Sequence, residues 1–139
     1  FETNVENAHD AGVLLTLDIQ DESAEVLGET EAIDQLLTNL VDNAIKYTGA
    51  GGKVTVHLRR VGQMASIEVE DTGIGISRGE TTRIFERFYR IDRARSRDVG
   101  GTGLGLAIVK HIALAHNGNV SVDSLLDKGS TFTVQLPLA

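Results

Sequence analysis

The stretch Asp71-Thr72-Gly73-Ile74-Gly75-Ile76 ends a strand-like pattern in a glycine cluster, and a second cluster, Gly101-Thr102-Gly103-Leu104-Gly105-Leu106, leads into an apolar run. The segment between them is rich in arginine and holds Arg78, Arg83, Arg87, Arg90, Arg93, Arg95 and Arg97. Because the whole chain has a formal charge of -7, these cations indicate an anionic ligand or partner, although a solvated surface loop would also explain them. Glycine lets backbone approach a ligand closely and lets the segment move. The sequence therefore predicts a phosphate-bearing small molecule under a mobile basic flap.

Length and composition predict one soluble globular domain. The chain has 139 residues, of which 41% are hydrophobic and 24% charged, as is ordinary for a single domain. It has no Cys, which excludes a disulfide scaffold, a thiolate metal site and a thiol nucleophile. The acidic balance argues against nucleic-acid binding. No apolar run approaches the roughly 20 residues of a membrane helix, so we expect a cytoplasmic domain whose parent could still be membrane-bound.

The periodicity of apolar residues predicts the order of helices and strands. Strand-like alternation is expected at residues 13–19, 26–28, 53–60, 64–70, 120–125 and 130–138. Helices are expected at residues 30–47 and 104–115, and residues 77–88 are expected to be helical in part. Residues 61–63 and 127–129 should be hairpin turns, and residues 1–12 should be the end of a preceding helix or linker. Helices alternate with hairpins without a regular βαβ pattern, which predicts an α+β fold: a two-layer α/β sandwich whose mixed, mostly antiparallel sheet carries helices on one face.

The predicted helix at residues 30–47 has two distinct faces. Its apolar face holds Ile33, Leu36, Leu37, Leu40, Val41 and Ala44. Beside it, Asn39, Asn43, Lys46 and Tyr47 follow i, i+4, i+7, i+8 spacing. Asparagine is a poor helix former, so this stripe is either a solvated polar face or a site with amide oxygens for Mg²⁺, an ammonium for phosphate and a phenol for a ring.

The glycine clusters match neither of two common nucleotide-binding patterns. The spacing G-x-G-x-x-G fails at both clusters. The Gly52-Lys53 pair is followed by Val54, whereas a P-loop has Ser or Thr at that position. Asp71 can accept a hydrogen bond from an exocyclic amine, which favours adenine, or it can simply start a turn. The amides of residues 101–106 can face phosphates at a helix N-terminus, or can belong to an ordinary glycine-rich loop.

In order and spacing, these motifs closely resemble the ATP-binding catalytic domain of sensor histidine kinases, in the Bergerat-fold group that also includes gyrase B, MutL and Hsp90. Residues 39–47 resemble the N box, and residues 71–76 the first glycine box. Residues 84–90 resemble the F box, and residues 101–106 the second glycine box. Gly129-Ser130-Thr131-Phe132 is similar to the family's last motif. The resemblance implies an ATP-binding catalytic domain over residues 13–139, with a mobile lid at about 86–103.

The resemblance also implies a role for each matching residue. Asn43 is expected to ligate the Mg²⁺ between the phosphates, with Asn39 beside it. Lys46 is expected to contact phosphate, Tyr47 to lie against adenine, and Asp71 to accept from the adenine amino group.

The remaining ATP-binding positions are implied in the glycine boxes, the lid and the last motif. Asn43, Lys46 and the lid residue Arg87 are expected to take part in catalysis, and Arg90 is expected to contact phosphate with Arg87. The other positions are Gly73, Gly75, Ile76, Gly101, Thr102, Gly103, Leu104, Gly105, Leu106 and Thr131.

The resemblance departs from the family pattern in two places. Glu29 stands where the family usually has Asp, and the phosphoacceptor histidine is missing: the one His-acid pair, His9-Asp10, lacks the proline that follows in the family. The resemblance therefore implies that the domain binds Mg²⁺-ATP and donates its γ-phosphate to a histidine on a separate dimerisation and phosphoacceptor domain. The parent is expected to be a homodimer in the bacterial membrane that signals to a response regulator, and the isolated domain to be monomeric.

Three alternative functions stay open on the sequence. An ATPase of the gyrase B, MutL or Hsp90 kind uses a helix-borne Glu near the N box, whereas the carboxylate found there, Asp42, projects roughly 60° away from Asn39. A non-catalytic nucleotide-binding domain is the second alternative. A serine-protein kinase of the same fold is the third, because the sequence does not name the acceptor.

Overall fold

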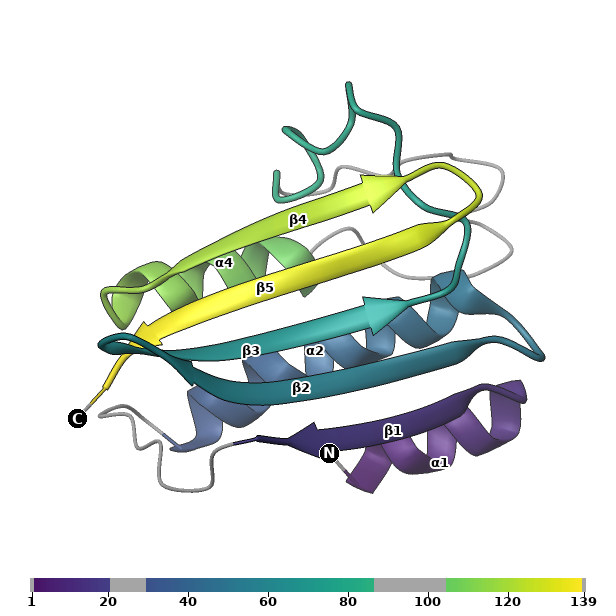
Figure 1. Cartoon of the computed structure of the whole chain (residues 1–139), viewed down its shortest axis with the longest axis horizontal. Helices are drawn as coiled ribbons and strands as arrows, with labels where there is room; N and C mark the ends of the chain where they lie inside the picture. The colour runs from purple at the N-terminus through teal and green to yellow at the C-terminus, as the bar shows by residue number, and fades with distance from the viewer. Residues whose placement is uncertain (1, 21–29, 87–104, 139) are drawn as a thin grey trace.

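A computed structural model describes residues 2–20, 30–86 and 105–138 of the chain. Within these ranges, helices cover one face of a five-stranded sheet (Figure 1). The helices are α1 (Glu2–Ala11), α2 (Thr30–Thr48) and α4 (Gly105–Ala115). The strands are β1 (Leu14–Ile19), β2 (Lys53–Val61), β3 (Met64–Asp71), β4 (Asn119–Leu125) and β5 (Gly129–Pro137). The predicted α+β sandwich is confirmed, and none of the helices in these ranges is long and apolar enough to cross a membrane.

The sheet is mixed and mostly antiparallel, as predicted. Its strand order is β1-β2-β3-β5-β4, with β1 parallel to β2 and every other neighbouring pair antiparallel. An apolar row crosses it, because Val56 pairs with Val69, Val69 with Phe132, and Phe132 with Val122. Both predicted hairpins, β2–β3 and β4–β5, are confirmed, while the strand predicted at residues 26–28 lies outside the described residues.

The core forms where α2 packs on the sheet. Leu36, Leu40, Val41 and Ala44 on this helix have no exposed surface, and the predicted apolar face is therefore the buried one. Burying a side chain of this size stabilises a fold by about 1.5–3 kcal/mol. Helix α2 thus has a fixed rotation about its axis, which turns the neighbouring asparagine stripe toward the edge of the core.

Helix α1 packs against α2. The Asn4 side chain is fully buried, and its Nδ2 donates to the Thr38 carbonyl oxygen at 3.1 Å. Ala8 is buried as well, and its carbonyl oxygen accepts from the Val13 amide at 2.9 Å. The chain therefore enters β1 at a fixed position, and the assignment of residues 1–12 to the end of a preceding helix stays a prediction.

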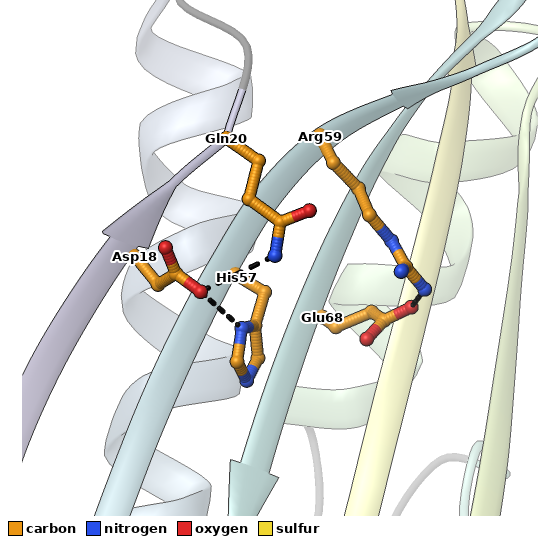
Figure 2. Close-up of polar contacts among 5 residues, drawn as sticks. All are labelled: Asp18, Gln20, His57, Arg59 and Glu68. Atoms are coloured by element: carbon orange, nitrogen blue, oxygen red, sulfur yellow. Dashed lines mark hydrogen bonds and ion pairs between the residues drawn. The ribbon is translucent and has the colours of Figure 1, made fainter.

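Two groups of polar side chains lie on the face of the sheet opposite the helices (Figure 2). His57 Nδ1 lies 3.1 Å from Asp18 Oδ2, and the same oxygen accepts from Gln20 Nε2 at 3.3 Å. The hydrogen bonds from Gln20 and then from His57 lower the pKa of the Asp18 carboxyl. Arg59 is ion-paired with Glu68 on β3. These side-chain pairs supplement the backbone ladder between β1, β2 and β3.

Residues 78–85 form consecutive hydrogen-bonded turns, so the partly helical segment predicted there contains no regular helix in its described part. Thr81 Oγ1 donates to the Arg78 carbonyl oxygen at 2.8 Å, and Thr82 Oγ1 donates to Gly79 at 3.4 Å. Such local side-chain bonds compete with a helix for the backbone, and Gly79 lowers helix propensity further.

Candidate functional site

The four residues of the N-box stripe lie on the last three turns of α2. Asn39, Asn43 and Tyr47 are partly exposed and Lys46 is exposed, while Ala44 between them is buried. The amide oxygens of the two asparagines are therefore placed at the boundary between core and solvent, where they can bind a hard cation that also keeps water or phosphate ligands.

Lys46 has a partner within its own helix. Its Nζ lies 3.1 Å from Asp42 Oδ2, in an i,i+4 pair that is about one-third exposed on each side. A partly exposed pair of this kind is worth about 0.3–0.5 kcal/mol, so an incoming phosphate can displace the carboxylate at little cost.

Asp71 is the most deeply buried charged residue of the predicted site, at 7% exposure. Its Oδ1 accepts hydrogen bonds from the Gly73 amide at 2.9 Å and the Ser130 amide at 3.2 Å. Burial raises the pKa of this carboxyl, and the two backbone hydrogen bonds oppose that shift. Among the described residues Oδ2 has no hydrogen-bond partner. One oxygen thus holds the carboxylate in place, and the other can accept from a ligand.

The glycines that follow Asp71 are required by the protein's own backbone. A Cβ at Gly73 would overlap the carbonyl oxygen of Tyr47, to which the Ile74 amide donates at 3.2 Å. Gly75 has a φ of 71°, and a Cβ there would overlap the carbonyl oxygen of Leu125. The sequence suggested that these glycines let backbone approach a ligand; the structure shows that they let the loop pass between the end of α2 and the β4–β5 hairpin.

The last motif reaches the site through Ser130. Its amide binds Asp71, whereas Thr131 pairs with Glu70 in the sheet. Because neighbouring strand residues point to opposite faces, Thr131 belongs to the polar outer face and Ser130 to the face of the core. Sequence reasoning named Thr131 and missed Ser130. A signal existed, since the buried alternation Ser130, Phe132, Val134, Leu136 contains one polar residue.

Ser124 is a second polar residue that sequence reasoning missed. The Ile76 amide donates to its Oγ at 2.7 Å, and that Oγ also lies 2.7 Å from Ser130 Oγ. Ser124 lies on the same face of β4 as Val120 and Val122, so the alternation along the strand would place an apolar side chain there. Ser130 occupies the equivalent kind of position on β5.

The other predicted positions divide into described and undescribed residues. Ile76 is buried, Gly105 begins α4 and Leu106 packs against the core. Phe85 of the F box contacts Phe132 edge-to-face, with ring centroids 6.1 Å apart. The positions outside the described residues are Arg87, Arg90, Gly101, Thr102, Gly103 and Leu104. Across the described ranges no three His, Asp or Glu side chains gather to hold a metal ion.

Sequence comparison places residues 28–139 in one family, described as histidine kinase-, DNA gyrase B-, and HSP90-like ATPase. Sensor histidine kinase RppB of Synechocystis sp. is 48% identical over 128 residues, which are 92% of this chain and 28% of that protein. The chain therefore spans less than a third of the length of this relative.

Comparison with solved structures gives the same group. The mycobacterial sensor histidine kinase MprB superposes with a TM-score of 0.85 at 30% identity, over 99% of this chain and 92% of that one. Full-length ShkA in complex with AMPPNP superposes with a TM-score of 0.86 at 31% identity, over 99% of this chain and 28% of that one.

Proposed function

The chain belongs to the family of histidine kinase-, DNA gyrase B- and HSP90-like ATPases, and from this premise we propose that it binds Mg²⁺-ATP and donates the γ-phosphate to a histidine outside this sequence. The acceptor would lie on the dimerisation and phosphoacceptor domain of a sensor histidine kinase. That parent would be a membrane-anchored homodimer that signals to a response regulator.

The observation that carries this proposal is the fixed carboxylate of Asp71. A buried acceptor with one oxygen held by two amides and the other without a described partner fits the 6-amino group of adenine. Guanine carries a carbonyl oxygen at that position, which the carboxylate would repel. ShkA, at 31% identity, is a complex with the ATP analogue AMPPNP, which supports the same ligand class here.

The phosphates would lie toward the exposed end of the N-box stripe. Mg²⁺ commonly uses one or two protein oxygens and takes its remaining ligands from water and phosphate, so the donor set of Asn43 and Asn39 fits this ion. Bound there, the ion would neutralise charge on the phosphates. Lys46 would leave Asp42 and add a second positive charge, and Arg87 and Arg90 of the lid would add others.

Phosphoryl transfer then requires positioning more than covalent chemistry from this chain. An acceptor imidazole nitrogen attacks the γ-phosphorus, the bond to the β,γ-bridging oxygen breaks, and ADP leaves. Two histidines of this chain already have hydrogen-bond partners. His57 Nδ1 lies 3.1 Å from Asp18 Oδ2, and His116 Nδ1 lies 2.8 Å from the Ile112 carbonyl oxygen. Asp42 projects roughly 60° away from Asn39 on α2, which disfavours its use as the water-activating base of an ATPase.

Calorimetric titration with a non-hydrolysable ATP analogue, with and without Mg²⁺, tests the binding step. Asn43→Ala should weaken binding in Mg²⁺ more than binding in its absence. Gln35→Ala is the matched control, because this exposed amide lies on the same helix about 12 Å from Asn43 along its axis. An equal loss of affinity with and without Mg²⁺ in Asn43→Ala would remove the metal-binding role of Asn43.

A further inference from the structure

The Ser124 hydroxyl joins two segments that hold Asp71. It lies on β4, is partly buried, and accepts from the Ile76 amide of the glycine loop at 2.7 Å. It also donates to the carbonyl oxygen of Gly129 at 3.1 Å and lies 2.7 Å from Ser130 Oγ. One side chain therefore contacts both the loop after Asp71 and the first residues of β5.

The bonding capacity of a hydroxyl group assigns the direction of each bond. A serine oxygen donates one hydrogen and accepts two. If Ser124 donates to Gly129, the hydroxyl of Ser130 must donate to Ser124, and the Ile76 amide fills the second acceptor position. All three positions are then used, which is the condition under which a partly buried polar network is rigid.

This network fixes the two donors of Asp71 relative to each other. Gly73 lies three residues before Ile76 on the glycine loop, and Ser130 is itself a member of the network. The two segments are 57 residues apart in sequence from Gly73 to Ser130, and no backbone ladder joins the loop to β5 beyond the Asp71–Ser130 pair. The loop also meets the β4–β5 turn through the Asp127 amide, which donates to the Ile74 carbonyl oxygen at 2.7 Å. Ser124 is the side chain that links the loop to the first residues of β5.

We propose that Ser124 is a positioning residue that sets the discrimination between adenine and guanine nucleotides. It does not touch the nucleotide; it holds the Gly73 and Ser130 amides so that Asp71 presents Oδ2 in one orientation. This inference rests on the proposed function, because it assigns to Asp71 the recognition of the adenine amine.

Removing the hydroxyl should loosen recognition in a base-specific way. Ser124→Ala leaves the Ile76 amide and the Ser130 hydroxyl without their partner, and the side-chain link between the two amide donors of Asp71 is lost. The ATP-to-GTP affinity ratio should fall roughly threefold to tenfold, the size expected for the loss of one well-oriented hydrogen bond. Ser124→Thr keeps the oxygen and should retain the ratio. Ser121→Ala, on the exposed face of the same strand, should leave it unchanged.

The test measures dissociation constants for non-hydrolysable ATP and GTP analogues in Mg²⁺, at a temperature where circular dichroism shows every variant folded. A lower ratio in Ser124→Ala that is restored in Ser124→Thr supports the inference. An equal loss of affinity for both nucleotides, or an unchanged ratio, overturns it.

A nucleotide-free measurement separates this inference from the proposed function. Hydrogen exchange of the Gly73 and Ser130 amides should accelerate in Ser124→Ala and stay at the wild-type rate in Ser124→Thr. Unchanged exchange overturns the positioning role even if the wild type binds ATP. Faster exchange in a protein that binds neither nucleotide supports the positioning of Asp71 and overturns the proposed function together with the discrimination that rests on it.

Discussion

Replacing Gly75 by alanine tests whether this glycine serves the fold or the ligand. Gly75 has a φ of 71°, and a Cβ there would overlap the Leu125 carbonyl oxygen. Gly62 is a matched control, because it has a φ of 60° in the β2–β3 turn and no atom within 4 Å of its added Cβ. Both substitutions impose the left-handed conformation on alanine. Gly75→Ala also forces the glycine loop away from the end of β4.

The expected losses of unfolding free energy follow from the strained backbone conformation and, at Gly75, from the steric overlap. Left-handed alanine costs about 1–2 kcal/mol, and the smaller entropy of the unfolded chain offsets about 0.4–1 kcal/mol of it. Gly62→Ala should therefore lower the free energy of unfolding by about 1 kcal/mol. Gly75→Ala adds about 1–3 kcal/mol of overpacking and weakens the 2.7 Å bond from the Asp127 amide to the Ile74 carbonyl oxygen. We expect a total loss of about 2–5 kcal/mol, a large part of the stability of a small domain.

Urea unfolding followed by circular dichroism gives both losses, since the chain has no Trp for fluorescence. Equal losses of stability in the two variants would show that the contact with the Leu125 carbonyl oxygen does not require a glycine at position 75. A Gly75→Ala variant that keeps the stability of Gly62→Ala and loses nucleotide affinity alone would show that the ligand, and not the fold, needs this glycine.

Three further predictions concern burial and charge. Burial raises the folded-state pKa of Asp71, so the contribution of Asp71 to stability should fall as pH rises from about 3.8 through that pKa, whereas the lowered pKa of Asp18 acts in the opposite direction. The change in unfolding free energy from pH 4 to pH 7 should therefore be less favourable in wild type than in Asp71→Asn. Leu40→Ala, at a site with no exposed surface, should cost about 2–5 kcal/mol of unfolding free energy, whereas Leu17→Ala, 45% exposed, should cost less than about 1 kcal/mol in the same urea assay. Asp42→Asn should change stability by less than about 0.5 kcal/mol and should strengthen Mg²⁺-ATP binding in calorimetry, because Lys46 no longer has to leave a carboxylate.

The sequence predicted those parts of the fold that depend on local periodicity. Helix α2, helix α4 and both hairpins were predicted within about two residues of their ends, because apolar spacing and turn residues specify them. The sequence did not indicate that β1 runs parallel to β2 or that β5 lies between β3 and β4. Those pairings join segments far apart in the chain, and their register depends on which faces are buried together.

The site was predicted as a set of motifs and not as a set of contacts. Asp71 was identified from its position at a strand end, and the structure adds the amides that hold it. Thr131 was preferred to Ser130 because motif matching does not state which residue of a strand faces the core. Residues 77–88 were expected to be helical in part, and residues 78–85 form turns with an α-type bond from the Ile84 amide to the Glu80 carbonyl oxygen. Residue periodicity does not report the threonine hydroxyls that bond to nearby carbonyl oxygens in these turns.

The two ends of the proposed nucleotide site differ in how they are built. Asp71 is buried and held by a loop that contacts both the Tyr47 carbonyl oxygen at the end of α2 and the β4–β5 hairpin, so displacing it requires the shift of three packed segments. Asn43 is partly exposed and Lys46 is 38% exposed on one helix, and the Lys46–Asp42 pair is weak. A conformational change that alters ATP affinity therefore costs the least free energy where it moves the phosphate-binding residues. The adenine end would then keep its selectivity for the base, and the strength of binding would be set where the phosphates meet α2.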